Sequence, residues 1–380
     1  MNEIGIYIHI PFCARKCYYC DFISFANKEK EIDRYCNSLI KEIQHESKKI
    51  NKQDVATTIY IGGGTPSFVD AKYITEIIET IRNNYMVEKN AEITIEVNPG
   101  TADENKLKEY KKCGVNRLSI GLQSTQNELL KQIGRIHTYE EFLNCYNLAR
   151  KIGFNNINVD LMLGLPNQSL QDIEESLNKV IKLNPDHISL YSLIIEKNTP
   201  IEKMLQDGAL NMPPEELERQ MYWKTKDILE KNSYIHYEIS NFAKKGYESK
   251  HNSNCWKQKD YLGFGVAAHS YYESKRYCNT NLIEEYCKNI ENNNYGKNRI
   301  VCEIQSHEER QKEYILLGLR MINGVDIQEF KNKFVDNPIY IFHNELEKLV
   351  NLNLVEIDLN QIKLTKKGLD FANLVWEEFV

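Results

Sequence analysis

Three cysteines stand close together near the amino terminus. Cys13, Cys17 and Cys20 have the spacing C-x3-C-x2-C directly after a predicted strand, so one loop carries all three. Thiolates are the ligands of iron–sulfur clusters, and a cluster of about four irons held by three of them keeps one iron open to a further ligand. A structural zinc site or free thiols are the alternatives, but zinc would need a fourth ligand at similar spacing, and His9 is expected inside the strand. The segment therefore predicts a [4Fe–4S] cluster.

A second unusual segment is the run from Gly62 to Gly64, followed by Thr65 and Pro66. Glycines let the backbone approach a ligand that side chains would keep away. By itself the run is also compatible with a tight connection between a strand and a helix.

The composition excludes some classes of function. The chain has 380 residues, 42% hydrophobic and 27% charged, which is ordinary for a globular protein of about two or three domains. The net charge of −6 gives no general attraction to nucleic acid, no apolar run reaches the ~18 residues of a membrane span, and the amino terminus lacks a signal sequence. We therefore expect a cytoplasmic protein whose seven other cysteines are reduced and mostly small buried side chains.

The first half of the chain alternates strands and helices. Apolar runs predict strands at 5–10, 57–61, 92–97, 117–123, 157–163 and 187–195. Amphipathic segments predict helices at 28–50, from 70 onward, and at 103–113, 139–152 and 170–183. This rhythm indicates an α/β fold with a parallel sheet, either a partial barrel or a doubly wound sheet. In both, functional groups gather at the carboxyl ends of the strands.

The second half divides into three parts. A helix ending near residue 231 and a strand at 234–239 complete a first domain, 1–240, and 241–300 are expected to be a connecting region of loops and short strands. Residues 301–380 predict a separate, winged-helix-like unit, with helices near 308–321, 326–334, 340–352 and 366–379 and a hairpin at 355–357 and 361–364. Because this unit has no basic stripe, we expect it to pack or to recognise a partner other than nucleic acid.

Taken together, these segments resemble the radical SAM superfamily and, more closely, the oxygen-independent coproporphyrinogen III oxidase family. The motifs that carry the resemblance are Tyr7–Cys13, Ile61–Ser67, Glu96–Gly100, Gly121–Ser124, Gly134–His137 and Asp160–Pro166. The resemblance covers nearly the whole chain and implies a partial (β/α)6 TIM-like barrel with a smaller α+β, winged-helix-like C-terminal domain. It also implies that S-adenosylmethionine (SAM) binds the open iron and is cleaved by one electron from the cluster.

The resemblance assigns a set of residues to SAM. Glu96 suits the amino group, Asp160 the ribose hydroxyls and Arg135 the carboxylate, onto which a guanidinium forks. A network of structural salt bridges around the barrel rim is the alternative. The implied SAM set is Tyr7, Tyr19, Gly63, Gly64, Thr65, Glu96, Gln123, Arg135, Asp160 and Ile194, with Gly265–Ala267 as a further candidate for the adenosine side.

The residue two positions after the third cysteine departs from the oxidase pattern. The oxidases have a fourth cysteine there, and this chain has Phe22. In this respect it resembles an oxidase-like branch of heme chaperones, which carry a motif H-N-x-x-Y-W; here the motif spans His251 to Trp256, with Cys255 at the tyrosine position. The motif implies a role in heme handling for His251, with Trp256 either stacking on the porphyrin or only packing, and with Cys255 as an alternative thiolate ligand.

Three functions therefore stay open. The first is a heme chaperone with a [4Fe–4S] cluster and SAM, which delivers heme to hemoproteins, including respiratory ones at the inner face of the membrane. The second is the SAM-dependent oxidative decarboxylation of coproporphyrinogen III, and the third is a radical SAM reaction on another substrate. Phe22 and the His251 motif favour the first. The sequence does not decide whether SAM is cleaved or whether the protein forms a homodimer.

Overall fold

The computed structural model describes residues 2–380. Six parallel strands lie side by side in chain order: β1 (Glu3–Ile10), β4 (Val55–Gly63), β5 (Met86–Val97), β6 (Arg117–Gln123), β7 (Ile157–Leu163) and β8 (His187–Ser192). A doubly wound sheet would reverse its strand order at a switch point, whereas a barrel wall keeps the order of the chain. The predicted partial (β/α)6 barrel is therefore confirmed, although its last strand ends three residues earlier than expected.

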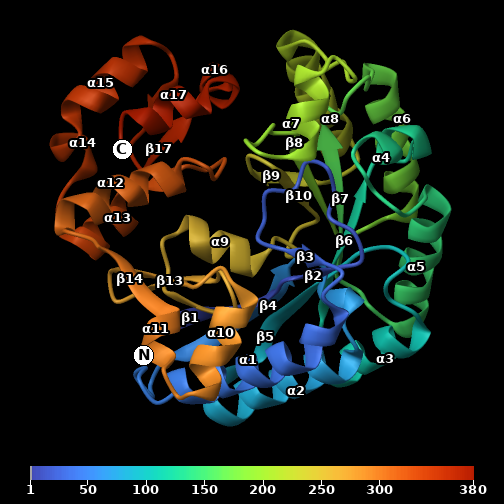
Figure 1. The fold of residues 1–380 in the computed structure, drawn as a ribbon. Coiled ribbons are helices and arrows are strands. Elements are labelled where there is room, and N and C mark those ends of the chain that lie inside the picture. The colour runs from blue at the N-terminus through green and yellow to red at the C-terminus, as the bar shows by residue number, and fades with distance from the viewer. Residues whose placement is uncertain (1) are drawn as a thin grey trace.

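Helices cover the outer face of this sheet (Figure 1). They are α1 (Ile32–Glu46), α2 (Ala71–Asn84), α3 (Glu104–Lys112), α4 (Asn127–Gln132), α5 (Tyr139–Ile152) and α6 (Leu170–Leu183), and α7 (Pro200–Gln206) and α8 (Glu215–Lys231) follow β8. Their ends obey local sequence rules. Thr138 and Glu141 form a capping box at the start of α5, and Gly153 ends this helix with a φ of 99° that only glycine adopts easily.

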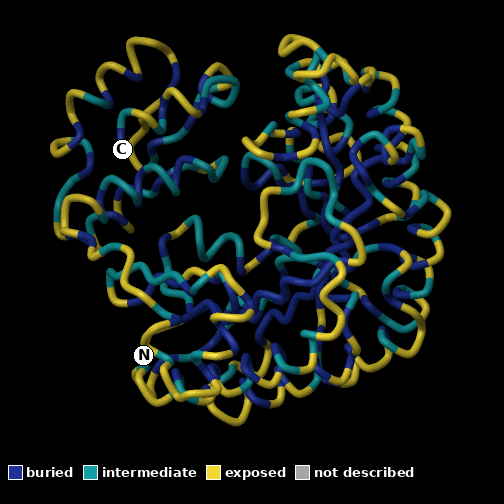
Figure 2. Tube along the Cα trace, viewed as in Figure 1, coloured by how far each residue is buried: buried dark blue, intermediate teal, exposed yellow. Residues whose placement is uncertain are grey.

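Strand β6 shows that one face of the sheet packs against the helices and that the other face lines the interior of the barrel. Successive side chains of a strand point to opposite faces. Leu118, Ile120 and Leu122 are fully buried in the core shared with the helices, whereas the alternate residues, beginning with Arg117 and ending with Gln123, line the interior of the barrel. The buried strands and the more exposed outer turns are visible in Figure 2.

Residues 241–300 extend the same sheet on both sides. β10 (Asn241–Ala243) pairs with β8 and with β9 (Ile235–Glu238), and β11 (Tyr261–Phe264) pairs parallel with β1. β12 (His269–Tyr272), β13 (Lys275–Asn279) and β14 (Arg299–Ile304) continue the sheet to its other edge. Helices α9 (Lys250–Trp256), α10 (Ile283–Glu291) and α11 (Tyr295–Asn298) lie between these strands in the sequence. The region predicted to connect two domains thus contributes strands to the sheet of the first domain. The domain boundaries themselves stay a prediction.

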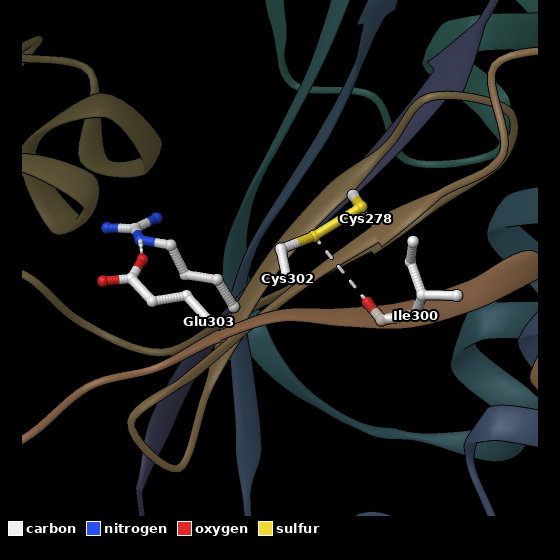
Figure 3. The surroundings of a disulfide bond; sticks show 5 residues. Cys278, Ile300, Cys302 and Glu303 are labelled. Carbon is white, nitrogen blue, oxygen red and sulfur yellow. Dashed lines mark hydrogen bonds and ion pairs between the residues drawn. A yellow bond between two sulfur atoms is a disulfide. The ribbon is translucent and has the colours of Figure 1, made fainter.

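Two of the scattered cysteines differ from the expectation of reduced thiols. Cys278 on β13 and Cys302 on β14 form a disulfide (Figure 3). The antiparallel pairing of these strands brings together residues that are 24 apart in the sequence, which spacing alone did not reveal. Cys36, Cys113, Cys145 and Cys287 are buried free thiols, as predicted.

The C-terminal unit has its own core and packs beside the barrel (Figure 1). It contains α12 (His307–Gly318), α13 (Ile327–Phe334), α14 (Pro338–Ile341) and α15 (His343–Asn351), and the strands β15 (Val325–Asp326), β16 (Val355–Ile357) and β17 (Gln361–Leu364) form a small antiparallel sheet. The predicted last helix is divided at Phe371 into α16 (Lys366–Asp370) and α17 (Ala372–Glu377). Among residues 2–380, no helix combines the length and the apolar character that crossing a membrane would require.

Candidate functional site

The cysteine loop is held at its base by two short strands. β2 (Phe12–Cys13) pairs in parallel with β3 (Phe25–Ala26), so the loop between them, with Cys17 and Cys20, leaves and returns at one place. The amide of Tyr18 donates a hydrogen bond to the carbonyl of Ile133 over 3.0 Å, which ties the loop to the end of α4. The loop therefore stands over the carboxyl ends of the barrel strands.

A cavity of about 560 Å³ lies under this loop. Cys13, Cys17 and Cys20 line it, together with nine of the ten residues assigned to SAM: Tyr19, Gly63, Gly64, Thr65, Glu96, Gln123, Arg135, Asp160 and Ile194. No three His, Cys, Asp or Glu side chains among residues 2–380 converge on the position of a single ion, and the three cysteines lie around the cavity wall. The sequence had placed these residues on separate strands and loops, and the fold brings them to one chamber of the usual size for a small-molecule site.

The glycine run passes close to the first cysteine. A side chain at Gly64 would place its Cβ 3.0 Å from Cys13 Sγ, and one at Gly63, whose φ is +112°, would come within 2.6 Å of the His9 ring. The hydroxyl of Thr65 donates to Cys13 Sγ over 3.4 Å. Burial raises the pKa of both the Cys13 and Cys20 thiols, so iron must displace their protons when it binds. The donor set and the missing Cβ atoms fit a cluster held against the backbone.

Glu96 is a half-buried carboxyl at the end of β5. Its Oε1 accepts a hydrogen bond from the Tyr60 hydroxyl over 2.8 Å, and its Oε2 accepts one from the Gly63 amide over 3.1 Å. Burial, aided by the nearby Asp160, raises the pKa of Glu96 to about 7. At neutral pH this carboxyl is thus close to its titration midpoint, and a cationic ligand would favour its charged form.

Asp160 lies on the next strand but one and faces the same chamber. Asn158 donates to its Oδ1 over 2.6 Å, and the Ser119 hydroxyl is 3.5 Å from Oδ2. Burial raises the pKa of Asp160, although Asn158, Ser189 and nearby guanidinium groups oppose the shift. Its remaining acceptor positions suit hydroxyl donors such as those of a ribose.

Arg135 and Gln123 complete the polar wall. Arg135 donates from Nη2 to Asn98 Oδ1 over 2.8 Å and to the Gly121 carbonyl over 2.6 Å, and its Nη1 lies 3.6 Å from Cys17 Sγ. Its Nε is buried and has no partner among residues 2–380, and the guanidinium lines the cavity, where its charge suits a ligand carboxylate. Gln123 accepts a hydrogen bond from the Tyr191 hydroxyl over 2.8 Å, and its amide nitrogen has no such fixed partner.

Two residues stand at the mouth of the cavity, and one assigned residue stands apart from it. Ile194 follows the end of β8 and is 68% exposed, and Phe22, at the position of the absent fourth cysteine, is 62% exposed. Tyr7 does not line the cavity; its hydroxyl is 2.9 Å from His9 Nδ1 on the same strand. The Gly265–Ala267 turn also lies away from it, where the amide of Gly265 donates to the buried Glu42.

The histidine motif forms a helix, α9, where a loop was expected. The hydroxyl of Ser249 caps it, and the amides of Lys250 and His251 donate to the two carboxylate oxygens of Glu92, each over 3.0 Å. Glu92 is about 160 positions away in the sequence, so local patterns could not reveal this anchor. The next residue of the motif, Asn252, lines the cavity.

His251 is packed inside the molecule, and Trp256 is half-buried. His251 is only 7% exposed; its Nδ1 is 2.8 Å from Thr58 Oγ1, and its ring stacks on Tyr60. Burial, with a smaller contribution from Arg117, lowers the pKa of His251 to about 4, so the imidazole is neutral. The guanidinium of Arg320, from the C-terminal unit, lies 4.3 Å over the Trp256 ring. Burial raises the pKa of Cys255 to about 11, which disfavours a thiolate there.

Sequence reasoning missed several residues of the cavity wall. Tyr60, Asn98, Asn158 and Tyr191 hold the assigned groups in place through the hydrogen bonds described above. Arg117 is the most conspicuous omission, because it is a charged residue at the start of a strand whose other residues are uncharged. Arg117 is separated from Ser119 and Gln123 by even numbers of positions, so all three face the same side of the sheet. This spacing was the signal that pointed to the barrel interior.

Comparisons with known proteins agree with this architecture. Residues 7–180 match the family model "Radical SAM superfamily", and residues 305–371 match "HemN C-terminal domain". Proteins called "Heme chaperone HemW" from Lactococcus lactis and Bacillus subtilis are 37% and 36% identical to this chain, over 98% of it and over 96% and 98% of their own lengths. The solved structure of coproporphyrinogen III oxidase (HemN) from Escherichia coli, described as a radical SAM enzyme, superposes with a TM-score of 0.87 at 24% identity, covering 100% of this chain and 90% of the other.

Proposed function

The chain belongs to the HemW family of the radical SAM superfamily, and on this premise we propose that it is a heme chaperone, which binds heme and delivers it to hemoproteins. The observation that carries the proposal is the similarity to these chaperones along nearly the whole of both chains. Phe22 supports the same function, because the resemblance places the oxidases' fourth cysteine at this position. The superfamily uses a [4Fe–4S] cluster and SAM, and the cysteine loop and cavity suit both.

In this proposal, different residues of the cavity recognise different chemical groups of SAM. Cys13, Cys17 and Cys20 hold the cluster by their thiolates. Glu96 accepts a hydrogen bond from the amino group, the positive charge of Arg135 faces the carboxylate, and Asp160 accepts hydrogen bonds from the ribose hydroxyls. When bound, the cluster and SAM supply one-electron chemistry at a sulfonium. The chain itself fixes the orientation of these polar groups through the hydrogen bonds described above.

Heme binding must involve a rearrangement of α9 if His251 is the iron ligand. The imidazole is neutral, which ligation requires, but it is buried and faces Thr58. The face of Trp256 is covered by Arg320. We therefore propose that α9 moves away from β4 when heme is bound, so that His251 and Trp256 become accessible together.

The test is a heme titration beside an activity assay on one anaerobically reconstituted sample. We expect stoichiometric heme binding, followed by the Soret band, and no conversion of coproporphyrinogen III to protoporphyrinogen IX with SAM and reductant. Conversion would instead establish the oxidase as the function. The variant His251→Ala should lose the heme spectrum of the wild type while it keeps its iron content, whereas His343→Ala, which removes an exposed histidine, should change neither.

The recipients and the assembly state are further parts of the proposal. We propose that the recipients are hemoproteins, including respiratory ones, and that the protein meets these at the inner face of the membrane. Cosedimentation of heme-loaded protein with vesicles that contain such a recipient, and with empty vesicles, tests this directly. Light scattering with and without heme tests whether a homodimer forms; a monomer under both conditions would exclude a heme-dependent dimer.

A further inference from the structure

Arg117 is a buried guanidinium at the floor of the cavity, and it has no ion-pair partner among residues 2–380. It opens β6, is 2% exposed and lines the chamber beneath Glu96 and Asp160. The structure records no ion pair or side-chain hydrogen bond for it with any of residues 2–380, and its buried Nε has no partner. An isolated charge in such a place is strongly unfavourable unless opposite charges lie nearby.

The register of the sheet places two carboxylates near this charge. Ser119, one inward-facing position above Arg117, pairs with Glu96, and Gly121, the next inward-facing position, pairs with Asp160. Arg117 therefore lies below both carboxyls on the strand between them. Its charge lowers the pKa of each and so opposes the effect of burial.

Among residues 2–380, Arg135 is a second cation near these carboxyls, and it acts on Asp160. The titratable or charged groups that face them from the other elements are Tyr7, Tyr19, Tyr60, Tyr191 and Arg135. The tyrosines are neutral, because burial raises the pKa of each. Arg135 hydrogen-bonds to Asn98, Gly121 and Cys17, and of the two carboxyls it lowers the pKa of Asp160, whereas the cation that lowers the pKa of Glu96 is Arg117. Below the carboxyls, the rings of His187 and His251 are also neutral, and the charge of Arg117 helps to keep them so.

We propose that Arg117 is a positioning residue for SAM: it is the buried counter-ion that keeps Glu96 and Asp160 charged, so that they can accept the amino group and the ribose of the ligand. It acts through the two carboxylates and does not itself touch SAM. The absence of a direct ion pair is part of this role, because a guanidinium hydrogen-bonded to either carboxylate would occupy the oxygens that the ligand needs.

The inference rests on the SAM site proposed above and is tested by SAM binding as a function of pH. For the wild type with its cluster, equilibrium dialysis should show affinity rising with pH through the titration of Glu96, near pH 7. In Arg117→Met the midpoint should move upward by about one pH unit or more, with an affinity loss of about tenfold at pH 7 that is recovered at higher pH. Arg117→Lys, which keeps the charge, should restore the wild-type profile.

Controls separate this role from others. Arg299→Met removes another mostly buried arginine, which pairs with Glu46 away from the cavity, and should leave the profile unchanged. Iron content and circular dichroism report folding, and Arg117→Gln serves as a second neutral variant if Arg117→Met does not fold. If SAM binding by the neutral variants keeps the wild-type midpoint, the inference is wrong; an equal loss at every pH would mean that Arg117 binds the ligand directly. If the wild type binds no SAM, the site itself fails.

Discussion

The ring of Tyr60 stacks on the imidazole of His251, with the ring centroids 5.1 Å apart. The hydroxyl of the same tyrosine donates a hydrogen bond to Glu96. One side chain of β4 thus touches both the helix of the proposed heme motif and a carboxyl of the proposed SAM site. Any movement of α9 that exposes His251 removes the packing partner of Tyr60. Such a movement should therefore disturb the hydrogen bond between Tyr60 and Glu96.

The first prediction concerns this tyrosine. In Tyr60→Phe the Glu96 carboxylate loses a buried hydrogen bond, so its pKa should rise and SAM affinity at pH 7 should fall by about three- to tenfold. Equilibrium dialysis measures the change, and Tyr295→Phe, a substitution on α11 far from the cavity, is the control. If Tyr60→Phe binds SAM with the wild-type affinity, this hydrogen bond does not change the pKa of Glu96.

The second prediction concerns the cluster ligands. Cys17→Ala should remove the charge-transfer absorbance of the reconstituted cluster and most of its iron, because two thiolates cannot replace three at the cavity wall. Cys145→Ala, which truncates a buried thiol in the helical core, should keep both while it lowers stability. A Cys17→Ala protein with a full complement of iron would contradict the ligand assignment.

The third prediction links function to stability through Glu96. The pKa of this carboxyl is raised from 4.5 in the unfolded chain to about 7 in the folded one. Between these values the folded chain binds the extra proton, so stability falls as the pH rises through this window. Glu96→Gln should therefore stabilise the chain without cofactors by about 1–3 kcal/mol at pH 8, while it abolishes SAM binding.

Denaturant unfolding of the cofactor-free chain at pH 6 and pH 8 measures this effect. The wild type should lose stability between the two values, and Glu96→Gln should lose less. Glu88→Gln, at an exposed position of the same strand, should follow the wild type. An equal pH dependence in all three proteins would refute the raised pKa.

The fourth prediction concerns acid stability and the buried histidine His236. Burial lowers the pKa of His236 to about 4, and its ring stacks on Phe242 with a centroid distance of 4.4 Å. Below pH 6.5 the unfolded chain takes up a proton that the folded chain does not, so stability falls as the pH drops from 6.5 toward 4. His236→Phe should reduce the loss between pH 7 and pH 5 by about 1–2 kcal/mol. The exposed His343 offers the matched control, since His343→Phe should leave the loss unchanged.

The fifth prediction concerns the contact between the barrel and the C-terminal unit. Arg320 lies between the rings of Trp256 and Trp376, at 4.3 and 5.1 Å from their centroids. Arg320→Ala removes both contacts and should increase amide hydrogen exchange in α9 and at the start of β15 by a few-fold, with little effect inside the C-terminal core. Lys312→Ala on α12 removes a charge that pairs with Glu308 on the same helix and should leave exchange as in the wild type.

The sequence by itself determined those features that depend on short-range pattern. The spacing of the three cysteines predicted a cluster loop, and the alternation of apolar runs with amphipathic segments predicted six strands that the structure places in order. Phe22 was informative because it is defined by its distance from Cys20 alone. The resemblance also assigned ten residues to SAM, and nine of them share the cavity because parallel strands bring their carboxyl ends to one edge.

Only the tertiary structure decided features that depend on contacts between distant segments. The motif around His251 became a helix because Glu92, from a strand far away in the sequence, accepts its first amides. Cys278 and Cys302 are joined because β13 and β14 pair. Arg117 acquired its place beneath Glu96 and Asp160 through the register of three strands. Strand pairing and burial decide which groups these residues contact, and neither can be read from the residues next to them in the chain.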